Sequence, residues 1–158
     1  TEHYPKAKLL MPGEGPLQDQ LRELIAEQGL QENVNLPGFR DDIERIVCAL
    51  DVLLMPSSKE GLGTAVLDAM AAGVPVVATN CGGLAESVIH EQTGLVVEPE
   101  NPQAIADSVL CLLRDDDLAK RLRESALNHV SKNFSAKRMV EGNLSVYRKI
   151  LSRQPTPL

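Results

Sequence analysis

The sequence predicts an α/β domain in which a parallel sheet lies between two layers of helices, in a doubly wound arrangement. Short apolar runs alternate with longer stretches whose apolar residues recur at helical spacing, which is the pattern of consecutive βα units. The apolar runs contain Val and Ile with few polar residues between them, as in strands covered by helices on both faces. The length of 158 residues corresponds to one domain of about 150 residues.

Proline and glycine separate the elements in the first third of the chain. The segment from Pro12 to Pro16 ends the first apolar run, and Leu17, Leu21 and Leu24 then share one helical face. Carboxylates favour helix starts, so Asp41 and Asp42 are expected to open a short helix. The elements expected here are a strand at 8–11, a helix from about Pro16 to Gly29, a strand at 34–36, a short helix to Val47 and a strand at 51–55.

The remainder of the chain continues the alternation and then becomes entirely helical. Thr64 is expected to cap a helix that Gly73 ends, and Ser135 to cap the last helix, because both hydroxyls can accept a backbone N–H. The other expected elements are strands at 74–78 and 95–97, a helix through 85–89, and helices at 102–113, 116 to about 132, and 135–151. We therefore expect a Rossmann-like domain over 1–134 and a C-terminal helix with a frayed tail over 135–158.

Composition excludes several classes of function. Sixteen Lys and Arg against 22 Asp and Glu give a net charge of −6, which argues against a nucleic-acid partner, because phosphate neutralisation needs a basic surface. Three cysteines lack metal-ligand spacing and are expected to be reduced thiols in a cytoplasmic protein. No apolar run approaches the roughly 20 residues of a membrane helix. His3, His90 and His129 match no motif and are expected to face solvent.

Three glycine-containing loops follow expected strands. They span 12–16, 57–63 and 79–83, and the carboxyl ends of parallel strands meet at one edge of a sheet, where ligands of such folds bind. Glycine lets backbone N–H groups approach an anion, and a helix start adds partial positive charge. For each loop alone, a tight strand-to-helix turn is the better explanation of the glycines. Together, the three loops favour a ligand that carries phosphate.

The most informative segment is the loop at 57–63 with the helix after it. Glu60 lies on the loop and Asp68 in the helix, with Gly61 and Gly63 between them. A carboxylate beside an anion-binding helix start is electrostatically unusual unless it accepts hydrogen bonds from ligand hydroxyls. This arrangement suits a ligand with a diphosphate in the middle and hydroxyl-rich groups at both ends.

This segment, together with Gly13-Glu14-Gly15-Pro16 and Cys81-Gly82-Gly83-Leu84-Ala85-Glu86, resembles the C-terminal donor-binding domain of retaining glycosyltransferases of the GT-B fold, often called group 1 or family 4. The resemblance runs from about Lys8 to Leu151 and keeps the order of the three motifs. The family motif is E-x7-E, and this chain has Asp68 at the second acid. The family domain also opens with one more strand and helix, which carry an Arg and a Lys, and neither segment is found here.

The resemblance implies a role for each matching residue. Glu60 would contact the transferred sugar as the catalytic-site acid that positions the donor, and Asp68 would hold the ribose through a side chain one methylene shorter than Glu. The remaining residues implied at the nucleotide sugar are Gly13, Gly15, Gly38, Arg40, Gly61, Leu62, Gly63, Thr64, Ala65, Val66, Gly82 and Gly83. Glu86 is more readily explained as a structural helix residue.

The resemblance also implies the reaction. The chain would be the donor-binding part of a hexosyl- or glycosyltransferase that moves a sugar from a UDP-, GDP- or ADP-sugar to a glycan, lipid or other acceptor. It would need no metal or cofactor, and Asp115-Asp116-Asp117 would cap a helix. Without the N-terminal acceptor domain, which could also contact a membrane peripherally, we expect no transfer. The alternatives are a nucleotide-binding or interaction module without catalysis, and a GT-B nucleotide-sugar epimerase.

Overall fold

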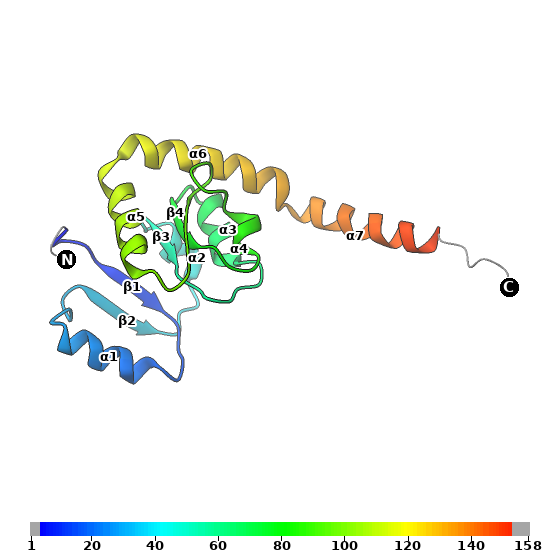
Figure 1. The fold of residues 1–158 in the computed structure, drawn as a ribbon. Coiled ribbons are helices and arrows are strands. Elements are labelled where there is room, and N and C mark those ends of the chain that lie inside the picture. The colour runs from blue at the N-terminus through cyan, green and yellow to red at the C-terminus, as the bar shows by residue number, and fades with distance from the viewer. Residues whose placement is uncertain (1–3, 153–158) are drawn as a thin grey trace. The chain divides into compact units, whose positions relative to one another are not determined.

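The computed structural model describes residues 4–152, which form two units. One unit ends at Arg45 and the other begins at Ile46, and each is described by itself (Figure 1). Strands alternate with helices throughout the described part, and every strand pairing is parallel. The predicted α/β class is therefore confirmed. The strands form a two-stranded and a three-stranded sheet in place of one continuous sheet.

The first unit is a βαβ element of which much remains exposed. Strands β1 (Leu9–Pro12) and β2 (Val34–Gly38) pair in parallel around α1 (Gln18–Glu27), and α2 (Ile43–Val47) follows at the junction between the units. Leu9 is 43% exposed and α1 buries no residue. The expectation that each strand is covered on both faces is therefore not met for β1 within this unit, because α1 is the one long helix that the described part of the unit supplies.

The second unit contains a three-stranded sheet whose central strand is buried. Its strands are β3 (Leu53–Met55), β4 (Val76–Thr79) and β5 (Leu95–Val97), in the order β3-β4-β5. All four residues of β4 are buried, as expected for a central parallel strand. The helices of this unit are α3 (Thr64–Ala71), α4 (Leu84–Ser87), α5 (Pro102–Arg114), α6 (Asp116–Asn133) and α7 (Ala136–Leu151).

Side-chain alternation along β4 divides the core into two faces. Val77 packs with Leu112 of α5 and Leu122 of α6, whereas Val76 and Ala78 point to the opposite face. Helix α3, whose Val66 and Met70 are fully buried, contacts β3 and β4. Figure 1 shows α5 on one side of β3 and β4, and α3 with α4 on the other. The loop after β3 ends where α3 begins, and the loop after β4 ends where α4 begins.

The helix ends confirm some capping predictions and correct others. Ser135 accepts a hydrogen bond from the backbone N–H of Arg138 (3.3 Å), as predicted. Thr64 is not the cap of α3: it is the first helical residue, and the cap is Gly63 in the left-handed region at φ 73°. Helix α4 stops at Ser87 because Val88 is extended, so the helix expected through 85–89 is a single turn.

Helix α7 carries an exposed apolar face. Met139, Tyr147 and Ile150 are each at least 60% exposed, and no residue of α7 is buried. Among the described residues, no helix has both the length and the apolar character needed to cross a membrane. The expected boundary between 134 and 135 stays a prediction.

Candidate functional site

The loop between β3 and α3 carries the two acids of the central motif. Glu60 is half-buried on this loop, and Asp68 is exposed on α3, one helical turn beyond Thr64. Asp68 forms no ion pair or side-chain hydrogen bond with any described residue. Its carboxylate is therefore free to accept hydrogen bonds from a ligand, and it lies on the same helix face as Thr64.

The start of α3 presents unbonded backbone N–H groups. Within residues 4–152, the backbone N–H groups of four successive residues donate no hydrogen bond; the residues are Leu62, Gly63, Thr64 and Ala65. The N–H of Val66, in contrast, donates to the Gly63 carbonyl (2.9 Å). The first amides of a helix lack partners within it and point along the positive end of its dipole. The four amides can therefore accept an anion without breaking a hydrogen bond, whereas Val66 already has an acceptor.

The Glu60 carboxylate folds back on its own loop. The backbone N–H of Gly61 donates to Glu60 Oε1 at 3.0 Å. The amide of Gly61, implied by the resemblance to contact pyrophosphate, is thus occupied by the neighbouring side chain. A ligand that drew the carboxylate toward its hydroxyls would release this N–H.

The glycine pair after β4 packs against the same loop. The backbone N–H of Gly83 donates to the Glu60 carbonyl (3.3 Å). A Cβ atom at Gly82 would overlap the carbonyl oxygen of Glu60, and one at Gly83 would overlap that of Gly61. Gly82 also has φ 48°, in the left-handed region. These two glycines therefore allow the loops after β3 and β4 to lie in backbone contact.

The remaining predicted site residues lie in the first unit. Gly13 at φ 131° donates its N–H to the carbonyl of Gly38 (2.8 Å), which brings the loops after β1 and β2 together. Gly15 is exposed and makes no close approach. A cavity of about 310 Å³ beside this loop is lined by Met11, Pro12, Gly13, Glu14, Gly15, Pro16, Leu17, Gln18, Leu21 and Leu36.

Arg40 is held by an ion pair inside this unit. Its Nε and Nη2 atoms donate to the two carboxylate oxygens of Asp42 at 2.7 and 2.6 Å. The hydrogen bonds to Asp42, and then its charge, raise the pKa of the Arg40 guanidinium above the ordinary value. The same hydrogen bonds lower the pKa of the Asp42 carboxyl. A ligand that recruited Arg40 through these nitrogens would have to compete with Asp42.

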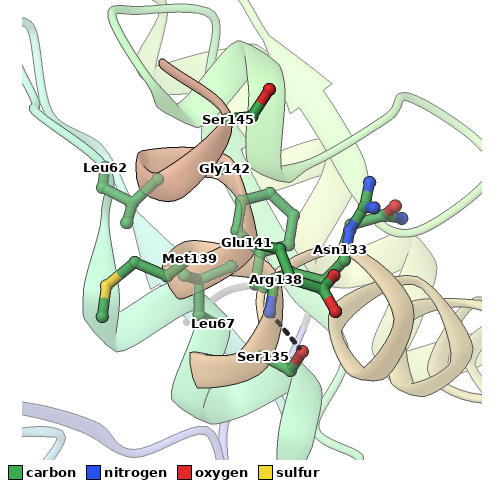
Figure 2. Close-up of a pocket in the computed structure, with 10 residues that line it drawn as sticks. Leu62, Leu67, Asn133, Ser135, Arg138, Met139, Glu141, Gly142 and Ser145 are labelled. Carbon is green, nitrogen blue, oxygen red and sulfur yellow. Dashed lines mark hydrogen bonds between the residues drawn. The ribbon is translucent and has the colours of Figure 1, made fainter. Parts of the chain in front are cut away.

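A groove borders the Glu60 loop on the side of α7. It has a volume of about 580 Å³, and Leu62 lies at one edge with the first turns of α7 along it (Figure 2). Ser135 and Arg138 form the capping hydrogen bond drawn there. The lining residues are Leu62, Leu67, Asn133, Phe134, Ser135, Arg138, Met139, Glu141, Gly142 and Ser145. Only Leu62 belongs to both this groove and the predicted donor site.

Other titratable residues have structural roles. Asp115 caps α6 and accepts the N–H of Leu118 (2.9 Å), as predicted. His90 is exposed, and its Nδ1 accepts the N–H of Val96. His129 is half-buried, with its ring 5.6 Å from that of Phe134, so the expectation that it faces solvent is wrong. His3 lies outside the described residues. In the described part of the chain, no group of His, Cys, Asp and Glu is placed to hold a metal ion.

Known proteins resemble this chain over most of its length. A family model described as "Glycosyl transferases group 1" matches residues 1–129. The N-acetyl-alpha-D-glucosaminyl L-malate synthase of Bacillus anthracis is 31% identical over 145 residues, which are 92% of this chain and 38% of that protein. The chain thus spans well under half of this relative.

Solved structures give the same picture. The Anabaena protein Alr3699/HepE, solved in complex with UDP-glucose, superposes with a TM-score of 0.81 at 28% identity, over 94% of this chain and 42% of that one. A C-terminal domain of a group 1 family protein, LpcC of Francisella tularensis, superposes with a TM-score of 0.77 at 29% identity, over 85% of this chain and 73% of that domain. The similarity is to part of a longer polypeptide in the first case and to a separately solved domain in the second.

Proposed function

Since the chain belongs to the glycosyl transferases group 1 and corresponds to their donor-binding domain, we propose that it holds the nucleoside diphosphate sugar from which a retaining enzyme transfers the sugar. The observation that carries this proposal is the row of unbonded N–H groups at 62–65, beside the Glu60 carboxylate. A diphosphate matches the amides and the helix dipole. Sugar hydroxyls match the carboxylate.

The amides and the α3 dipole would supply most of the attraction for phosphate. Lys59 is the only basic residue in the segment 57–68, and the chain carries a net charge of −6. Backbone N–H groups bind anions without a compensating cation, but with less long-range attraction than Arg or Lys would give. We therefore expect weak binding of nucleoside diphosphates, with an affinity that falls only modestly as salt is raised.

Glu60 would exchange one partner for another when donor binds. Its Oε1 accepts the N–H of Gly61 in the structure. Hydroxyls of the donor sugar would take over the carboxylate, and the released N–H of Gly61 would join the other amides at the diphosphate. Glu60 would position the sugar so that the diphosphate can leave. Backbone N–H groups that are already oriented in the protein would stabilise the charge on the departing diphosphate. Asp68, further along α3, would contact the ribose.

Titration of the chain with UDP, GDP and ADP, and with one sugar conjugate of each, tests this assignment by calorimetry. We expect at least one nucleotide and its sugar conjugate to bind. Glu60→Ala should lower the affinity for the sugar conjugate roughly tenfold, since a hydrogen bond to a charged group contributes about 1.5 kcal/mol. The bare nucleotide should lose little. Glu86→Ala is the matched control, because Glu86 is an exposed acid on α4. Equal losses for nucleotide and conjugate in Glu60→Ala would contradict the sugar-contact role.

The activity of the whole enzyme is part of the same proposal. The chain covers 38% of the Bacillus anthracis relative, so the acceptor, a glycan or lipid, would be bound by the rest of a longer polypeptide, which could also contact a membrane. We expect a cytoplasmic enzyme and no transfer by this chain alone. Asp68 in place of the family Glu supports one alternative, a nucleotide-binding module without catalysis. Sugar transfer by the full-length protein would exclude that alternative.

A further inference from the structure

The loop at 57–63, which carries the proposed phosphate site, is held by hydrogen bonds from residues 79–87. Three of its backbone carbonyls accept hydrogen bonds from that segment. The Ser57 carbonyl accepts from the side chains of Thr79 and Cys81, the Glu60 carbonyl from the N–H of Gly83, and the Leu62 carbonyl from the hydroxyl of Ser87 at 3.0 Å. The loop is thus held at its beginning, middle and end.

Ser87 is the only hydrogen-bond partner of the Leu62 carbonyl among the described residues. Its side chain is fully buried, at the last position of α4. The hydroxyl also lies 3.1 Å from the Gly83 carbonyl, but that carbonyl already accepts the backbone N–H groups of Glu86 and Ser87 at 3.1 Å. The carbonyl of Leu62 therefore depends on this hydroxyl, and the carbonyl of Gly83 does not.

The direction of one carbonyl sets the direction of the next amide. A trans peptide is planar, so the C=O of Leu62 and the N–H of Gly63 point in opposite directions, and the described residues contain no cis peptide. While Ser87 holds the Leu62 oxygen, the N–H of Gly63 points to the other side of the loop. That N–H is one of the four unbonded amides at the start of α3.

We infer that Ser87 is a positioning residue for the donor diphosphate: its buried hydroxyl holds the Leu62 carbonyl and thereby aims the N–H of Gly63 at the phosphate. This inference rests on the proposed function. Gly63 itself cannot be replaced cheaply, because it has φ 73° and a Cβ there would overlap the side chain of Leu84. Ser87 is not among the residues predicted to contact the donor. From the protein interior, it sets the orientation of the peptide between Leu62 and Gly63.

Ser87→Ala removes the hydroxyl and leaves the rest of the residue. We expect affinity for whichever of UDP, GDP and ADP the parent chain binds to fall roughly 3- to 10-fold, the effect of one hydrogen bond. The amide resonance of Gly63 in the ligand-free chain should shift as its peptide loses a fixed orientation. Ser87→Thr keeps a hydroxyl and should retain affinity, even though its added methyl group lowers the melting temperature.

Thr93→Val is the matched control for loss of a buried hydroxyl. Thr93 is 4% exposed, and its hydroxyl oxygen accepts the N–H of Ile89 (2.8 Å) and has no hydrogen bond to described residues of the 57–62 loop. It should lower the melting temperature and leave nucleotide affinity and the Gly63 resonance unchanged. Parent-like affinity in Ser87→Ala, or an equal loss in Thr93→Val, would overturn the inference.

The failure of the proposed function gives a different result. In that case the unmodified chain binds none of the three nucleotides, and the role of Ser87 in donor binding is contradicted as well. The Gly63 resonance of Ser87→Ala then reports whether the hydroxyl still orients this peptide. An unchanged resonance would also overturn the structural part of the inference.

Discussion

Glycines of the loops in the two units have the same appearance in sequence and different physical roles. In the second unit, side chains at Gly63, Gly82 and Gly83 would overlap neighbouring atoms. In the first unit, Gly13 and Gly15 have open space around them, and of these two Gly13 has a positive φ and Gly15 does not. The loops after β3 and β4 therefore need glycine at these three positions because neighbouring atoms leave no room for a Cβ, whereas the loop after β1 has room for one at Gly13 and Gly15. The predicted effects of substitution follow this difference.

The largest effect is expected for Gly83→Ala. Its Cβ would overlap the Gly61 carbonyl oxygen and approach the Leu62 Cα at 3.0 Å, and backbone atoms cannot move aside as a side-chain end can. We expect a loss of about 3 kcal/mol in the free energy of unfolding, the upper part of the usual range for overpacking. Urea denaturation measures this loss.

Gly142→Ala provides the control for Gly83→Ala. Gly142 lies in α7 with no atom within 4 Å of a built Cβ, so alanine should gain up to about 1 kcal/mol from helix propensity. Similar stability for the Gly83→Ala and Gly142→Ala proteins would show that the two loops are not packed in backbone contact.

Gly63→Ala should cost less than Gly83→Ala. The left-handed conformation at φ 73° costs a residue with a Cβ about 1–2 kcal/mol, and the overlapping atom is the Cδ2 of Leu84, which a rotamer change can move. The same denaturation series gives the value. A loss exceeding that of Gly83→Ala would contradict this ranking.

Gly15→Ala should change the free energy of unfolding by less than about 0.5 kcal/mol, as for an exposed residue without strain. Gly15 has no atom within 4 Å of a built Cβ and no positive φ. Any larger loss would mean that this loop is packed as closely as the loops of the second unit, and would remove the contrast between the two units.

The smallest effect is expected at the exposed pair of Arg40 and Asp42. Because hydrogen bonding to Arg40 lowers the pKa of Asp42, its stabilising effect is present above the ordinary carboxyl range and is lost as pH falls through the lowered pKa. Arg40→Gln should raise the pKa of Asp42 in an NMR titration. The melting temperature at pH 7 should change too little to resolve, because an exposed ion pair contributes little to stability. An unshifted pKa would show that the pair does not persist in solution.

Local chemistry allowed much of the fold to be predicted. The apolar run of β5 and the capping hydroxyl of Ser135 match the structure, because both depend on neighbours in sequence. Thr64 failed as a cap because Gly63 occupies the cap position in the left-handed conformation, and Leu84 fills the space that a Cβ there would need. That contact joins residues far apart in the chain, so periodicity and propensity contain no signal for it.

In the candidate site, too, features set by neighbours in sequence could be predicted, and features set by the folded structure could not. Its motif residues could be identified from the sequence, and their clustering at 60–68 follows from chain order. The bond between Glu60 and the Gly61 amide, and the use of the Val66 amide inside α3, depend on rotamers and on the first turn of the helix. Ser87 was not predicted, since a serine after Glu86 carries no motif and its role arises from burial beneath Leu62.

An amide NMR titration of the chain with UDP, GDP and ADP tests the central claim, that the start of α3 binds the donor diphosphate through its backbone. At least one nucleotide should shift the resonances of Leu62, Gly63, Thr64 and Ala65, whose N–H groups donate no hydrogen bond to a described residue. Those of Thr93 and Leu118, whose environments lie outside this loop, should stay in place. Binding that leaves the four amides unshifted, or no binding by any of the three nucleotides, would contradict the account.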